Sequence, residues 1–334
     1  MMKKLVDLPI SEPIYNTYQN QTPGSAVLTN NPSVYNWYIN QVMILTCTKR
    51  FLNGFTSPQI NILNSNWKNN PYLIKKWYGT QFLKGHVHYV IRNLLDAGYY
   101  VYFNGVDDYY VKGKSWYHKR HFTHDGCICG YDQENKTYCL YAYNENWVCE
   151  KFWTPQKSIY TGFKACFEKG IFGNICGIKP TEEKVLFSNN EALKNISLYL
   201  NPASHQHFAI TEEIVYGISV HDYICKYLQK LYDGSIPYQN MDHRVFRLIW
   251  EHKKAMLERI KLIEADLCLD NSISERYTSI VRESDNCRML YAYYSLKQRN
   301  SILATINQKL INIRSVEEKL LEELLKKSKK EAGI

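Results

Sequence analysis

Apolar residues follow two different periods along this chain, and the change of period divides it into two regions. In the first region, helical spacing of apolar residues predicts helices over residues 33–50 and 83–95. Short apolar runs bounded by turn residues then predict strands, with one helix at 158–167. The predicted strands are 99–104, 124–131, 137–143, 148–153 and 173–178. We therefore expect an α+β N-terminal domain with an antiparallel sheet over residues 1–185.

After residue 185 the period of about 3.6 residues returns and continues towards the C-terminus. It predicts four helices, at 214–231, 242–267, 273–310 and 316–330. This second region, residues 186–334, is expected to be an all-α helical domain that forms a bundle or a long antiparallel arm. Its apolar faces would pack on the first domain or on a second copy of the chain, as a homodimer.

Composition and charge narrow the classes of partner. The 334 residues are 45% hydrophobic and 22% charged, which is enough apolar material for a core in each domain. The net charge of +9 attracts anionic partners. Because the basic residues are dispersed and no nucleic-acid motif accompanies them, we expect no nucleic acid. An acidic carrier protein or a phosphorylated cofactor arm fits the same charge.

The same sequence argues against membrane insertion and export. No apolar run approaches the roughly 18 residues that a membrane span needs, and the first residues lack the apolar stretch of a signal peptide. We therefore expect a cytoplasmic protein whose 10 Cys residues are reduced thiols. No phosphate-binding loop or dinucleotide-binding glycine motif is present, so no resident cofactor is expected.

Most of the candidate chemistry lies between residues 94 and 144. His121 and His124 precede an apolar strand that ends at the Gly-Tyr-Asp turn of residues 130–132. The next predicted strand ends at Asn144. This order brings a ring nitrogen and a side-chain amide to neighbouring strand ends, which is how a papain-like site orients its base.

The pattern resembles a known family. Its motif residues are the Leu-Leu-Asp-Ala-Gly-Tyr-Tyr-Val run at 94–101, Asp107, Tyr110, His121-x-x-His124, residues 130–132 and Asn144. They are similar to the N-terminal domain of the butirosin-biosynthesis-H type, which is related to C39 and papain-like cysteine peptidases. Residues 216–218 and 242–256 resemble a helical segment found beside such domains in proteins of nonribosomal peptide clusters. The resemblance implies a papain/C39-like fold and transfer of an acyl group from a carrier-protein thioester to an amine.

The resemblance also assigns roles to residues. His124 would be the general base and Asn144 its orienting partner, where the family usually has Asp. Asp107, Tyr110 and His121 would line the entrance for the substrate.

The nucleophile is the main departure from the family, whose cysteine lies near the N-terminus at the start of the first long helix. Depending on register, this chain offers Thr22, Ser25 or Asn36 at that place. Cys47 is the first thiol in the chain and is expected late in its helix, where it could be either catalytic or a buried apolar residue. Alternatively, the substrate amine attacks directly with His124 as base.

Four cysteines fall on three successive predicted strands: Cys127, Cys129, Cys139 and Cys149. A Cys-x-Cys pair could begin a thiolate metal site, but zinc sites more often use Cys-x₂-Cys turns. We interpret these residues as core thiols and expect no metal site.

Two functions remain open from the sequence. The first is an acyltransferase, or an amide-forming or amide-cleaving protein, that acts on a carrier-bound or thioester acyl substrate in peptide natural-product biosynthesis. The alternative is a non-catalytic family member that lacks the Cys nucleophile and binds an assembly-line protein or a peptide product.

Overall fold

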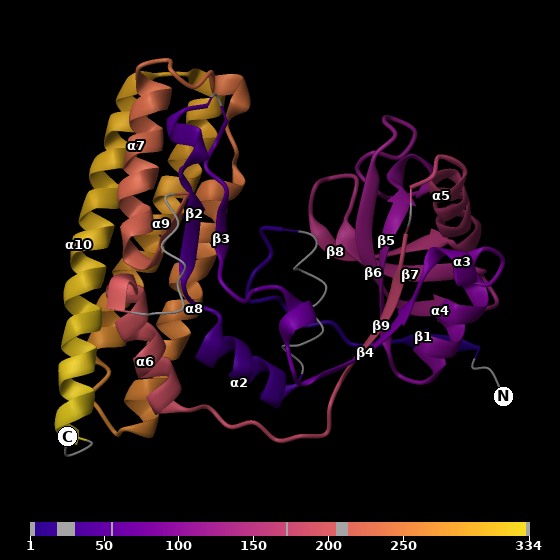
Figure 1. The fold of residues 1–334 in the computed structure, drawn as a ribbon, viewed down its shortest axis with the longest axis horizontal. Coiled ribbons are helices and arrows are strands. Elements are labelled where there is room, and N and C mark those ends of the chain that lie inside the picture. The colour runs from indigo at the N-terminus through magenta and orange to yellow at the C-terminus, as the bar shows by residue number, and fades with distance from the viewer. Residues whose placement is uncertain (1–3, 19–30, 55, 172, 205–212, 332–334) are drawn as a thin grey trace. The chain divides into compact units, whose positions relative to one another are not determined.

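The computed structural model describes residues 4–18, 31–54, 56–171, 173–204 and 213–331. It divides into two compact units, each with its own elements (Figure 1). Unit 1 contains residues 1–35 and 66–185, and unit 2 contains residues 36–65 and 186–334. The expected domain 1–185 is therefore interrupted, because residues 36–65 belong with the helical unit.

Unit 1 is built on an antiparallel sheet in the order β4-β9-β5-β6-β7-β8. The strands of this path are β4 (Leu73–Tyr78), β5 (Tyr100–Asp107), β6 (Thr123–Asp132), β7 (Thr137–Tyr143), β8 (Cys149–Pro155) and β9 (Ile175–Pro180). β5 pairs with β6 only as far as Ile128, and β1 (Leu5–Asp7) pairs with the same strand beyond that point. The predicted α+β class with an antiparallel sheet is confirmed for this unit.

One face of this sheet is covered by α4 (Val87–Asp96) and α5 (Gln156–Glu168), and α3 (Thr80–Leu83) precedes α4 (Figure 1). Val90, Ile91 and Leu94 of α4 pack with Ile159 and Phe163 of α5 in the apolar core of this layer. Their helical spacing is the reason that α4 forms here and buries this face. Gly98, with φ +77°, follows the end of α4 and allows the turn into β5.

Unit 2 consists of a helical bundle with a small sheet. Its helices are α2 (Pro32–Gln41), α6 (Asn189–Leu200), α7 (Val220–Tyr232), α8 (Arg244–Asp266), α9 (Ser272–Lys297) and α10 (Asn300–Glu331), of which α2 begins in unit 1. Its sheet is β10-β2-β3, formed by β2 (Leu45–Thr48), β3 (Ile60–Ile62) and β10 (Ile214–Tyr216). The predicted helical region is confirmed. The small sheet beside it was not predicted by the helical spacing of apolar residues.

Four predicted helices have different bounds. The one expected over 214–231 begins as strand β10 and becomes helical only from Val220, and the one expected over 316–330 is the second half of α10. The helix expected over 33–50 ends at Gln41, because residues 45–48 form β2 and pair with β10, which lies far along the chain. The helix expected over 273–310 is broken at Gln298, which has the left-handed φ of +50° and separates α9 from α10. Long-range strand pairing and a local turn therefore override the helical period.

A fully buried arginine attaches α2 to the bundle. Arg259 of α8 donates to the carbonyl oxygens of Ile39 at 2.5 Å and Tyr38 at 3.3 Å, and also to that of Val42. The last carbonyl groups of a helix lack partners within the helix, so this guanidinium supplies hydrogen bonds at the end of α2, where the Tyr38 carbonyl also accepts from the backbone N–H of Val42. His252 of α8 adds a hydrogen bond to the carbonyl of Met43 at 2.8 Å. These contacts explain why residues 36–65 fold with unit 2.

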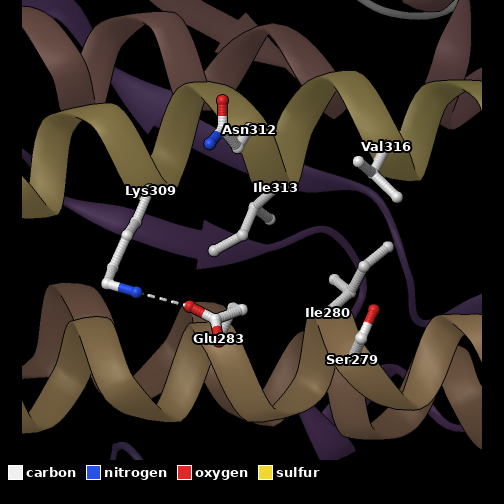
Figure 2. A pocket seen from close by; sticks show the side chains of 7 residues that line it. All are labelled: Ser279, Ile280, Glu283, Lys309, Asn312, Ile313 and Val316. Carbon is white, nitrogen blue, oxygen red and sulfur yellow. Dashed lines mark hydrogen bonds and ion pairs between the residues drawn. The ribbon is translucent and has the colours of Figure 1, made fainter.

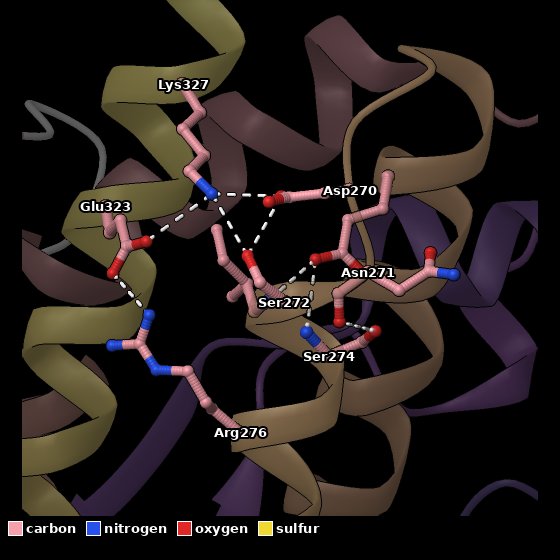
Figure 3. A network of polar contacts seen from close by, with 9 residues as sticks. Asp270, Asn271, Ser272, Ser274, Arg276, Glu323 and Lys327 are labelled. Carbon is pink, nitrogen blue, oxygen red and sulfur yellow. Dashed lines mark hydrogen bonds and ion pairs between the residues drawn. The ribbon is translucent and has the colours of Figure 1, made fainter.

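Polar contacts also fix the connection between α8 and α9 (Figure 3). The buried Glu264 carboxylate accepts from the backbone N–H groups of Ile273 and Ser274 at 3.0 and 3.1 Å, which caps the start of α9. Lys327 of α10 reaches Asp270 at 3.0 Å, and Arg276 pairs with Glu323 of α10 at 2.8 Å.

Five helices of unit 2 meet at the buried carboxylate of Glu317 in α10. Lys253 of α8 pairs with it at 2.6 Å, and the hydroxyls of Tyr199 (α6) and Tyr277 (α9) donate to it at 3.0 and 2.5 Å. His221 of α7 lies 3.8 Å from the same carboxylate. Burial alone would raise the pKa of Glu317, but the Lys253 ammonium, His221 and the hydrogen bonds from Lys253 and Tyr277 together lower it.

The Arg259→Met variant tests how much the contact to α2 contributes. Three backbone carbonyls would lose their buried donor, so we expect a loss of about 3 kcal/mol in the free energy of unfolding. Urea unfolding followed by far-ultraviolet circular dichroism measures this loss. The matched Arg276→Met variant removes an exposed ion pair and should cost less than about 1 kcal/mol. Equal losses in both variants would contradict the role given to Arg259.

Buried histidines make the stability of unit 2 depend on pH. Burial lowers the pKa of His221 to about 3, against an ordinary value of 6.5. The pKa of His221 is depressed in the folded state, so below about pH 6.5 the unfolded chain binds a proton that the folded chain does not. The free energy of unfolding therefore decreases as the pH is lowered. At pH 5 this single group should cost about 2 kcal/mol relative to pH 7. The difference between the urea midpoints at the two pH values should shrink in His221→Gln without vanishing, because burial also lowers the pKa of His252, whereas the exposed His243→Gln should behave as the unaltered protein.

Candidate functional site

His124 lies near the start of β6, opposite the irregular end of β5. The register between these strands shifts between Phe103 and Val106, and Val106 then pairs with His124. Gly105, with φ +72°, lies within this irregular stretch. The bulge carries the chain on to Asp107 and Asp108, which therefore lie beside the histidine.

The partner of His124 is the fully buried carboxylate of Asp108. The Nδ1 atom of His124 lies 2.9 Å from Oδ2 of Asp108. Lys114, whose side chain is also fully buried, lies 2.9 Å from the other carboxylate oxygen and donates to the carbonyl of Asp125 at 3.1 Å. Because Asp108 accepts from Nδ1, Nε2 is left as the basic nitrogen of the neutral ring.

A second aspartate–histidine pair lies beside the first. The carboxylate of Asp107 accepts from Nδ1 of His121 at 2.7 Å and from the backbone N–H groups of Tyr109 and Phe122. Burial alone would raise the pKa of Asp107, but these hydrogen bonds, with that of His121 the largest, lower it. The His121 ring stacks on Tyr109 at 4.3 Å between centroids and is half exposed. This pair therefore orders the loop around residues 108–122.

His124 opens onto a cavity of about 360 Å³. Its side chain is 23% exposed, so the ring is reached from solvent while its Asp108 partner is not. The cavity is lined by Tyr102, Asn104, Gly105, Thr123, His124, Asp125 and Ile171. A small molecule entering here would meet the imidazole, which makes this the candidate site.

Aromatic side chains extend from the site across the neighbouring surface. The ring of Phe122 lies 5.0 Å from that of His124, and Trp116 contacts Phe122 and Trp147 at centroid distances of 6.2 and 5.2 Å. We call Trp116, Phe122 and Trp147 the aromatic surface. Arg120 lies over the Trp116 ring at 5.7 Å, so a cation accompanies the apolar area.

The expected pairing of Asn144 with His124 is wrong. The Oδ1 atom of Asn144 accepts from the backbone N–H groups of Asn146 and Val148, and its Nδ2 atom donates to Glu150. Asn side chains stabilise turns in this way, and here the turn joins β7 to β8. The backbone of Asn144 bridges to Lys114, so the residue supports the site without contacting the histidine through a described hydrogen bond.

The candidate nucleophiles that the structure describes belong to unit 2, whereas His124 belongs to unit 1. Cys47 is buried in β2 of unit 2, and burial raises its pKa to about 12, so it is a poor thiolate. It lies in a strand and not late in a helix, which corrects the expectation. Asn36 belongs to α2 and unit 2, and Thr22 and Ser25 lie outside the described residues.

Of the predicted site residues, Asp107, Tyr110, His121 and His124 come together in unit 1. The roles of Asp108 and Lys114 were not predicted from the sequence. A signal was available in the two Asp residues at 107 and 108 and the two His residues at 121 and 124, which form two pairs in the same order. Lys114 carried no comparable signal, because a lysine in a polar loop is usually exposed.

A second cavity, of about 190 Å³, lies between α9 and α10 in unit 2 (Figure 2). Lys309 and Glu283 face each other in its lining and pair at 2.6 Å. This ion pair holds the pKa of Glu283 below its ordinary value. The charges lining this cavity are thus already matched, which favours the His124 cavity as the reactive one.

Comparison with known proteins leaves the family open. The chain matches no protein-family model and no curated protein sequence. Among the described residues, no helix is long and apolar enough to cross a membrane.

The Lys114→Met variant tests whether the cluster around Asp108 is built on a buried ion pair. Loss of the ammonium leaves a buried carboxylate with only the imidazole as partner, so we expect unit 1 to lose about 3 kcal/mol or more. Urea unfolding followed by Trp fluorescence reports mainly on this unit, which holds most of the Trp residues. The exposed Lys112→Met should change stability by less than about 0.5 kcal/mol. A similar small loss in Lys114→Met would refute the buried pair.

Proposed function

We propose that this chain transfers an acyl group from a thioester to an amine, with His124 as general base. The observation that carries the proposal is the His124–Asp108 pair at 2.9 Å, with the carboxylate buried and the imidazole at a cavity. We further propose that unit 1 is a papain/C39-like domain and that the reaction belongs to peptide natural-product biosynthesis, as the sequence resemblance implies.

The chemistry follows from the two ring nitrogens. Nε2 of His124 takes the proton of the attacking amine as the C–N bond forms, and the resulting imidazolium is stabilised by Asp108. When the C–S bond breaks, the same proton goes to the leaving thiolate, so the products are an amide and a free thiol. A protein nucleophile is not required on this route, which agrees with the burial of Cys47.

Lys114 has a positioning role in this scheme. Its ammonium lies 2.9 Å from the second oxygen of Asp108 and therefore holds the carboxylate in one orientation. A base whose partner cannot rotate loses less entropy when it engages the substrate. The Lys114 ammonium also offsets part of the negative charge of Asp108, so Asp108 stabilises the imidazolium less. Proton abstraction should therefore be slower than with an unpaired aspartate.

The aromatic surface supports a long, partly apolar substrate arm. Phe122 and Trp147 offer exposed apolar area and Trp116 packs half-buried between them, and Lys119 and Arg120 are exposed on the same loop. An acyl-phosphopantetheine arm combines an acyl chain with a phosphate, which such a surface would bind through packing and charge. The net charge of +9 favours an acidic carrier protein as donor.

A second candidate function is binding without catalysis. The observation that favours it is the raised pKa of the buried Cys47, together with its place in the other unit from His124. In this case the aromatic surface would hold an assembly-line protein or a peptide product, and His124 would serve as a hydrogen-bonding group.

The His124→Ala variant separates the two candidates. With an acyl-pantetheine thioester and a panel of amines, we expect amide formation to fall by about 100-fold or more, the usual contribution of a general base. Mass spectrometry of small products and of the intact protein follows the reaction. His86→Ala is the matched control, because His86 is exposed in the same unit and lies before α4.

Each outcome of this experiment is decisive. Amide without a protein adduct, lost in His124→Ala and kept in His86→Ala, supports direct aminolysis. A protein-bound acyl group would replace this mechanism with a covalent one and would identify the nucleophile by fragment mapping. Thioester binding without any product would favour the binding function.

A further inference from the structure

Two thiols and a carboxylate converge on the sheet of unit 1, apart from the His124 cavity. They are Cys129 of β6, Cys139 of β7 and Asp7 of β1, and their ligand atoms all lie within 4.8 Å of one another. The two sulfur atoms are 3.6 Å apart. Both thiols are fully buried, whereas the Asp7 side chain is 48% exposed, so the group is reached from one side.

The strand register builds this group. β1 pairs with β6 so that Asp7 lies opposite Gly130, and Gly130 in turn lies opposite Cys139. A Cβ atom at Gly130 would collide with the backbone of Val6 and Asp7, so glycine allows β1 to approach this closely. The register of β6 and β7 shifts between Ile128 and Gly130, which places Cys129 beside Cys139.

A hydrogen bond and a neighbouring cation complete the geometry of the group. Cys129 donates to the sulfur of Cys139. Lys151 of β8 pairs with Asp7 and reaches the carbonyl of Leu8 at 3.3 Å. The Lys151 ammonium therefore already occupies the exposed side of these three residues.

We propose that Cys129, Cys139 and Asp7 bind a thiophilic divalent cation of the zinc class. Two thiolates at about 2.3 Å from a tetrahedral ion lie about 3.8 Å apart, close to the 3.6 Å of this pair. A disulfide would require the sulfur atoms to close to about 2.05 Å. Binding releases the thiol protons to solvent and frees Asp7 from Lys151. Three protein ligands leave the fourth position to water, which is the arrangement of an open zinc site.

This assignment revises the interpretation of the strand cysteines as core thiols for two of the four. Cys127 is buried on the same strand but stands outside the group, and Cys149 is half-buried on β8. The Cys-x-Cys spacing therefore does not supply the pair of ligands. The pair comes from two neighbouring strands, which sequence spacing alone does not reveal.

Metal titration of the full chain tests the proposal. The chain is reduced and freed of metal, and Cd²⁺ is added while thiolate-to-metal charge-transfer absorbance is recorded; Zn²⁺ affinity follows from competition with a chelating dye. We expect one ion per chain and an affinity loss on the order of 100-fold or more in Cys129→Ala and in Cys139→Ala, since even an outer partner contributes 10–100-fold. Cys127→Ala is the matched control and should bind as the unaltered chain does.

Lys151→Met gives a readout that does not depend on removing a ligand. Without the competing ammonium, Asp7 is free for the ion, so Zn²⁺ affinity should rise by about tenfold. Absence of binding to the reduced chain, or equal losses in Cys127→Ala and Cys129→Ala, would overturn the proposal. Loss of two hydrogens from the mass on mild oxidation, with no metal bound, would instead define a redox pair and also overturn it. None of these outcomes depends on acyl transfer by His124.

Discussion

A fully buried carboxylate organises each of the two units. A carboxylate removed from water must be matched by cations and hydrogen-bond donors, or the fold loses several kcal/mol. In unit 1 Asp108 is matched by Lys114 and His124, and in unit 2 Glu317 is matched by Lys253 with two tyrosine hydroxyls. Glu317 therefore brings together helices that are distant in the sequence, whereas Asp108 joins the two ends of the loop between β5 and β6.

The two buried carboxylates have different consequences because their partners differ in solvent exposure. Around Glu317 the partners are all buried, so the network only holds helices together. Around Asp108 one partner, His124, is partly exposed at a cavity, so the same kind of pairing orients a ring that solvent can reach. A structural ion pair thus becomes a candidate site when one member reaches solvent.

The candidate site could be predicted only in part. The strand pattern after residue 123 and the position of His124 at its start followed from local sequence, because alternation and turn residues act over a few positions. The partner of His124 did not follow, since Asp108 reaches it only through the β5 bulge. Asn144 was expected instead because it ends a strand, yet its side chain is used by its own turn.

The sequence by itself determined the α+β region, the helical region and the histidines beside the sheet, because hydrophobic period and turn chemistry are local properties. Tertiary structure alone decided that residues 36–65 join the helical unit, through Arg259 and the pairing of β2 with β10. It also decided that Lys114 is buried and that Cys129 meets Cys139 and Asp7. These outcomes depend on which segments pair in the folded chain. The free energy of that pairing comes from both segments together, so the residues of one segment alone do not predict it.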